Sequence, residues 1–143
     1  MRIILDTNVL ISALIVPEGP PSYLYQCWRR GIFKLISSED QLDEFRRVSR
    51  YPRLQRFLSP AAAGTMVNVV RALAVLAGPL PHIDRSPDPA DNFLLAMAEA
   101  GEADYLVTGD GKHLLSLERH GNTRIVTARE AAAALGSAVR RDP

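Results

Sequence analysis

Four acidic residues have the type and placement to bind a metal ion: Asp6, Glu44, Asp91 and Asp110. Asp6 directly follows the aliphatic segment 2–5, and Asp110 follows the segment 104–108 after one glycine. Such runs predict buried strands, and open α/β sheets bind ligands at the carboxyl ends of their strands. Converging carboxylates repel one another unless protons or cations neutralise them, and oxygen ligands favour hard ions such as Mg²⁺ or Mn²⁺. The acids therefore indicate a metal-dependent site.

Each acid also has a simpler structural interpretation when it is taken alone. Asp6 could be only the N-cap of a helix that starts after the first strand, and Asp110 could belong to an ordinary Gly-Asp turn. Glu44 lies in an arginine-rich helix, where a glutamate usually forms a solvated ion pair, and its neighbour Asp43 is an equally plausible surface acid. The metal hypothesis therefore rests on the acids taken together.

Asp88 and Asp91 begin a further helix, with Pro89 between them at its first position. Asp88 is suited to cap this helix, and Asp91 would complement the helix dipole. The apolar stretch 93–98 that follows must pack closely on the sheet, which would hold the helix start near the strand ends. A structural role is sufficient for Asp88, whereas both roles remain open for Asp91.

The histidines and the cysteine argue against other metal or cofactor chemistry. His82, His113 and His120 show no ligand spacing, and with one cysteine in the chain a structural zinc site is implausible. Nothing in the sequence supports a catalytic histidine.

Cys27 lies among aromatic residues, has no partner for an intramolecular disulfide, and is expected in the core of a protein from a reducing cytosol. The chain has no Walker loop and no G-x-G-x-x-G motif, which disfavours nucleotide-cofactor folds.

The charge distribution suits a polyanionic substrate. The net charge is +1, but setting the four acids aside leaves 12 acidic against 17 basic residues. Five arginines follow Glu44 closely: Arg46, Arg47, Arg50, Arg53 and Arg56. Such a run is either a solvated helix face or, beside a metal pocket, a contact for a phosphate backbone, with Tyr51 available for base stacking.

The elements that must position these residues alternate along the chain. The 143 residues have the size of one domain. We predict strands over 2–5, 32–37, 104–108 and 123–127, with a short extended stretch over 80–84. Helices are expected over 7–15, 22–30, 39–50, 60–77, 89–98, 111–118 and 128–136, the third capped by Ser37 or Ser38 and the fourth by Ser59.

This alternation predicts an α/β fold with one central parallel sheet of about five strands, covered by helices on both faces. We place the domain at residues 1–136 and expect 137–143 to form a frayed C-terminal tail. No apolar run has the length of a signal peptide or a membrane span, so we expect a cytoplasmic protein.

The motifs together resemble those of PIN-domain proteins, in particular the VapC-like toxin ribonucleases of bacterial toxin–antitoxin pairs. The resemblance extends over the segments 2–14, 37–52, 84–115 and 123–131. It assigns the family's acidic set to Asp6, Glu44, Asp91 and Asp110, and accessory positions near the site to Asn8, Asp88 and Thr108. Asp88 and Asp91 compete for one role, and we favour Asp91 because it precedes the apolar helix segment.

The resemblance implies a divalent-metal-dependent endoribonuclease, often dimeric and inhibited by a cognate antitoxin. Asp6, Asp91 and Asp110 would coordinate Mg²⁺ or Mn²⁺, with Glu44 as a ligand directly or through water. RNA is the implied substrate, and the arginines assigned to its backbone are Arg46, Arg47 and Arg50.

Two other functions remain open at this point. One is a catalytically silent PIN-fold module that binds RNA or an antitoxin. The other is an aspartate-nucleophile phosphatase, which usually has a second Asp two positions after the nucleophile, where this chain has Asn8.

Overall fold

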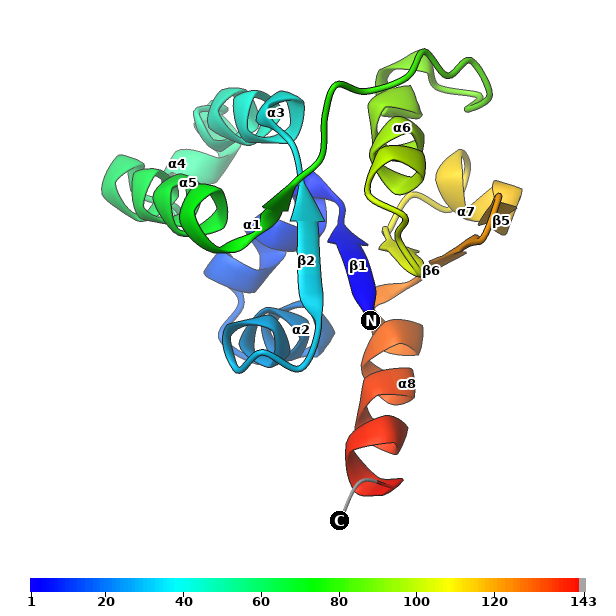
Figure 1. The fold of residues 1–143 in the computed structure, drawn as a ribbon. Coiled ribbons are helices and arrows are strands. Elements are labelled where there is room, and N and C mark those ends of the chain that lie inside the picture. The colour runs from blue at the N-terminus through cyan, green and yellow to red at the C-terminus, as the bar shows by residue number, and fades with distance from the viewer. Residues whose placement is uncertain (142–143) are drawn as a thin grey trace.

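The computed structural model describes the backbone of residues 1–141 and the side chains of residues 1–137 (Figure 1). Its centre is one sheet with the strand order β3-β2-β1-β4-β6-β5. Across the sheet, the neighbouring pairs β3-β2, β2-β1, β1-β4 and β4-β6 are parallel, and β5 is antiparallel to β6. The strands are β1 (Arg2–Leu5), β2 (Lys34–Ser37), β3 (Val75–Leu76), β4 (Tyr105–Val107), β5 (Arg119–His120) and β6 (Thr123–Val126). The predicted α/β fold with a mostly parallel sheet is confirmed.

Helices cover both faces of this sheet (Figure 1). They are α1 (Thr7–Ile15), α2 (Pro20–Arg29), α3 (Glu39–Ser49), α4 (Pro52–Gln55), α5 (Pro60–Leu73), the 3₁₀ turn η1 (Pro89–Asp91), α6 (Asn92–Ala100), α7 (Leu114–Leu117) and α8 (Ala128–Arg141). No helix among the described residues is long and apolar enough to cross a membrane.

Alternate residues of the strands divide the core into two layers. In β1, Ile3 and Leu5 pack with α1, α2, α3, α5 and the first turns of α8, while Ile4 packs with α6 and α7. Successive side chains of a strand point to opposite faces of the sheet, so a strand that is buried on both faces contributes to both layers. Cys27 is buried in the first layer, which confirms its predicted place in the core.

The predicted helix caps are formed by short polar side chains. Ser38 Oγ accepts a hydrogen bond from the backbone amide of Gln41, and Ser59 Oγ accepts one from the backbone amide of Ala62. These bonds satisfy backbone donors that the first turn of a helix leaves free. They fix where α3 and α5 begin.

Two predicted helix boundaries need correction. The helix expected over 60–77 ends at Leu73, because Val75 and Leu76 pair with β2 as the edge strand β3 and the Ala77 amide donates to the Ser37 carbonyl. The backbone of residues 137–141, expected in the frayed tail, continues α8 to Arg141, and residues 142 and 143 lie outside the described residues.

Gly101 allows α6 to end against β2. A Cβ at this position would lie 2.5 Å from Ile36 Cγ2 and 3.0 Å from the Met97 carbonyl oxygen. Any side chain here would push α6 away from the sheet. The close approach matters for function because α6 begins beside the acidic residues.

Candidate metal centre

Asp6 lies at the carboxyl end of β1 and is almost fully buried, with 7% of its surface exposed. Thr108, directly after β4, donates a hydrogen bond of 2.7 Å from its hydroxyl to Asp6 Oδ2. Asp6 occupies the N-cap position of α1, but its side chain makes no cap hydrogen bond. Burial raises the pKa of Asp6, the charge of Asp110 adds to this, and the Thr108 hydroxyl with the backbone amides of Thr7 and Asn8 offsets it only in part. A cap role alone does not account for this residue.

Asp110 is held beside Asp6 by the same threonine. The Asp110 amide donates to Thr108 Oγ1 over 3.1 Å, so one hydroxyl group connects the two acids. The carboxyl of Asp110 accepts from the His113 amide at 3.2 Å and lies 2.9 Å from His113 Nδ1. Burial would raise the pKa of Asp110, but the bonds from His113 and the contact with Asp91 outweigh it and lower the pKa. Asp110 is therefore the acid most disposed to carry a charge.

The start of α6 contributes Asp88 and Asp91. Asp88 Oδ1 accepts a 3.1 Å hydrogen bond from the Ala90 amide and caps η1 as predicted. Asp91 Oδ2 is buried and has no hydrogen-bond partner among the described residues. Burial, contact with Asp110 and the charges of Asp6 and Asp88 raise the pKa of Asp91 to about 7. The unpartnered oxygen and the raised pKa make Asp91 a candidate ligand for a cation.

Glu44 approaches the same site from α3. The side chain is half-buried, and its pKa is raised by burial and then by the charge of Asp6, while Arg47 and Thr7 lower it. The hydroxyl of Thr7 is near enough to favour the charged form, yet its oxygen is buried and forms no well-aligned hydrogen bond with the described residues. Half-buried Glu44 is therefore close enough to Asp6 to be affected by its charge, which a simple solvated ion pair with arginine does not account for.

Gln41 fixes the distance between α3 and the end of β1. This side chain is buried; its Nε2 donates to the Leu5 carbonyl at 2.7 Å, and its Oε1 accepts from the Ser37 hydroxyl at 2.6 Å. The paired residues of β1 with β2 run from Arg2 to Ile3, and the side-chain amide of Gln41 bonds to Leu5 beyond them. Glu44 lies three residues after Gln41 in the same helix.

The donor set is that of a divalent-cation site. One ligand atom each from Asp88, Asp91 and His113 lies within 4.8 Å of the others. Carboxylate oxygens suit Mg²⁺ and Mn²⁺. Burial is the main cause of the raised pKa values of Asp6, Glu44 and Asp91, and repulsion between the acids adds to it; a cation here would favour the charged forms against both effects. The residues present fit such an ion on their chemistry and on the unpartnered Asp91 oxygen.

Comparison with known proteins identifies the family of the chain. The family model described as PIN domain matches residues 2–112, a stretch that contains every acid of the site. The chain belongs to the PIN-domain family. An uncharacterized protein of Methanocaldococcus jannaschii is 27% identical over 118 residues, which cover 82% of this chain and 75% of that protein. No solved structure matches the chain at a significant level.

Family membership identifies the fold as one of the nuclease type. PIN domains have a nuclease-type fold, are typically metal-dependent, and bind RNA. In this PIN domain the acids come from β1, α3, the start of α6 and the residues after β4, which Figure 1 shows at one end of the sheet. Asp88, treated in the sequence as a competitor of Asp91, lies in the site together with it.

His113 is the residue of this PIN domain that sequence reasoning missed. We found no support for a histidine role, whereas the structure places His113 against Asp110 and within reach of Asp88 and Asp91. The available signal was its position three residues after Asp110, since the turn that follows a strand can fold back on itself over that distance. Asn8, by contrast, is exposed, and its backbone amide is what acts on Asp6.

The three arginines assigned to RNA line two separate pockets. Arg47 lines a groove of 340 Å³ together with Glu44 and Asp91. Arg46 and Arg50 line a separate cavity of 190 Å³ between α3 and α5, and Arg46 forms a 3.4 Å ion pair with Asp43. Arg47 is thus the arginine best placed to meet a phosphate at the acids.

Proposed function

We propose that this PIN domain is a divalent-metal-dependent endoribonuclease that hydrolyses phosphodiester bonds in RNA. The observation that carries the proposal is the buried Asp91 oxygen, which has no hydrogen-bond partner among the described residues and lies next to carboxyls whose pKa values are raised by burial and by one another. A carboxyl cluster this costly to charge is explained by a bound cation. The presence of Arg47 in the same groove supports a substrate with negative charge.

Each residue has a distinct part in the proposed reaction. Mg²⁺ or Mn²⁺ bound at the acids would supply a water of lowered pKa and offset the charge on the phosphoryl oxygens. Asp6, Asp91 and Asp110 would be the ligands, with Glu44 as a further one directly or through water. Arg47 would orient the scissile phosphate, since its guanidinium lines the groove beside Glu44.

Supporting contacts keep two of the ligands in place. Thr108 holds one oxygen of Asp6 through its hydroxyl, and His113 holds both oxygens of Asp110 through its amide and ring. Ligands fixed in this way need little rearrangement when a metal arrives. In-line attack by water would leave a 5′ phosphate and a 3′ hydroxyl, with no covalent intermediate on a side chain.

The biological setting is also part of the proposal. We propose that the protein is the toxin of a toxin–antitoxin pair, acts in the cytoplasm as a homodimer, and is inhibited by a cognate antitoxin at the active-site groove. This part is supported by the resemblance of its motifs to those of such toxins. A pull-down of the tagged protein from its own host, followed by identification of a small co-purifying partner, would test it.

The activity test uses a mixed panel of structured and unstructured RNAs with Mg²⁺, Mn²⁺ or EDTA. Wild-type protein should cut RNA only with metal, and Asp6→Asn and Asp110→Asn should lose the cutting while keeping their circular dichroism spectra. Asp43→Asn is the matched control, because Asp43 is an exposed acid of α3. Equal cutting by wild type, Asp6→Asn and Asp110→Asn would refute the assignment, and bound but intact RNA would indicate a silent binding module.

A further inference from the structure

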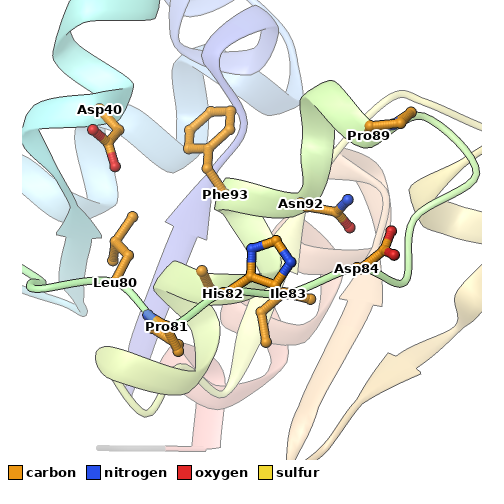
Figure 2. Close-up of a pocket in the computed structure, with 10 residues that line it drawn as sticks. Asp40, Leu80, Pro81, His82, Ile83, Asp84, Pro89, Asn92 and Phe93 are labelled. Atoms are coloured by element: carbon orange, nitrogen blue, oxygen red, sulfur yellow. The ribbon is translucent and has the colours of Figure 1, made fainter.

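A cavity of 630 Å³ adjoins the acidic groove of this PIN domain. It is open to solvent and is lined by the loop 80–84, the start of α6 and the first turn of α3, as Figure 2 shows. Asp40 and Phe93 line both this cavity and the groove that contains Glu44 and Asp91. A strand of RNA whose phosphate lies at the acids would therefore place a neighbouring nucleotide in the cavity.

The lining of the cavity suits a base and disfavours a phosphate. Its charged side chains are those of Asp40 and Asp84, and none of the described residues that line it is Lys or Arg. The rings of Phe93 and His82 offer flat surfaces, with Leu80 and Ile83 beside them (Figure 2). Unpaired bases bind proteins by stacking on such rings and by hydrogen bonds to their edges.

Asn92 presents at this cavity a side-chain donor, Nδ2, that makes no hydrogen bond with the part of the chain that the structure describes. Its Oδ1 accepts hydrogen bonds from the amides of Arg85 and Ser86, at 3.1 and 2.8 Å. Because two backbone donors fix the oxygen on their side, the Nδ2 group is turned away from them. The same bonds hold the loop next to α6, so that Asp84, the residue before Arg85, lies near Asn92. The Asp84 carboxylate has no hydrogen bond or ion pair with the described residues.

A free amide donor beside a free carboxylate matches one base. The Watson–Crick edge of guanine presents an acceptor, O6, next to two adjacent donors, N1–H and N2–H. Asn92 Nδ2 can donate to O6, while the carboxylate of Asp84, which only accepts, takes both N–H groups. Adenine, cytosine and uracil each present at least one acceptor where the carboxylate needs a donor. We propose that this cavity binds a guanine base next to the scissile phosphate, with Asp84 and Asn92 reading its edge and Phe93 under its ring.

The position of the guanine site beside the scissile bond rests on the proposed ribonuclease function. Binding of the base can be measured without cleavage. Guanosine, adenosine, cytidine and uridine, which have no phosphate, are titrated in EDTA while the side-chain NMR signals of His82 are followed. Guanosine should shift these signals saturably, with a dissociation constant at least about 10-fold lower than that of any other nucleoside. Asp84→Asn, which keeps the size of the side chain, should lower guanosine affinity about 10-fold, and Asp43→Asn should not.

Cleavage gives the second readout. Oligoadenylate RNAs with or without a single guanosine are compared in Mn²⁺, and the ratio of cutting beside guanosine to cutting beside adenosine should fall toward one in Asp84→Asn. Metal-dependent cutting without base preference, combined with no selective response to guanosine, would overturn the guanine site and leave the ribonuclease proposal standing. Selective guanosine binding without any RNA cutting would support the cavity and overturn the ribonuclease proposal.

Discussion

Replacing Asp91 with Asn should stabilise the metal-free protein at pH 8. The buried Oδ2 of Asp91 accepts no hydrogen bond from the described residues, so an amide in its place loses no contact. Burial and the neighbouring Asp110, Asp6 and Asp88 carboxyls raise the pKa of Asp91 from 3.8 to about 7. The fold therefore disfavours the charged carboxylate.

The pH dependence follows from the raised pKa of Asp91. Between about pH 4 and about pH 7 the folded protein holds this proton more tightly than the unfolded chain does, so the free energy of unfolding falls as the pH rises. Each pKa unit corresponds to about 1.36 kcal/mol, which sets a ceiling of about 4 kcal/mol. Because solvent screens the half-buried carboxyl, we expect a loss of about 1–2 kcal/mol, complete above pH 7.

Urea unfolding in EDTA at pH 4 and pH 8 measures this effect. The free energy of unfolding of Asp91→Asn should equal that of wild type at pH 4 and exceed it by about 1–2 kcal/mol at pH 8. When Mn²⁺ replaces EDTA, it should stabilise wild type but not the variant. Asp43→Asn, the exposed control, should follow wild type under all conditions. A variant less stable than wild type at pH 8 would show that the carboxylate is a structural acceptor, and an equal difference at both pH values would contradict the raised pKa of Asp91.

Three further substitutions test the scaffold around the acids. Thr108→Val removes the hydroxyl that donates to Asp6 and should weaken Mn²⁺ binding about 10-fold by calorimetry; unchanged binding would refute its positioning role. Gln41→Leu leaves the Leu5 carbonyl without its buried donor and should cost about 1–3 kcal/mol in urea unfolding, whereas a neutral effect would contradict its part in the fold. Gly101→Ala places a methyl group against β2 and should cost about 1–3 kcal/mol; a more stable variant would show that α6 can shift freely.

The sequence predicts those features of the site that depend on local signals. Aliphatic runs mark β1 and β4, so Asp6 and Asp110 follow as residues at strand ends. Short polar residues mark helix starts, and Ser59 and Asp88 cap the helices that they were expected to cap. These signals lie within a few residues of the element that they define, which is why the sequence is sufficient to read them.

The features that were missed depend on contacts between distant segments. Val75 leaves its predicted helix because its backbone pairs with Ile36, a residue from another part of the chain. Gln41 looks like an ordinary polar position until its bond to the Leu5 carbonyl is known, although a glutamine among the buried residues of α3 was a usable signal. His113 reaches Asp110 only through the conformation of one turn.

Calorimetric titration of Mn²⁺ into the purified protein tests the central claim most directly, because the account requires the acids to form a cation site before any RNA is bound. Wild type and Asp43→Asn should bind Mn²⁺ with the same affinity, and Asp6→Asn should lose most of that affinity while remaining folded. Absence of binding to wild type, or equal binding to wild type and Asp6→Asn, would contradict the claim that these carboxyls form a metal centre.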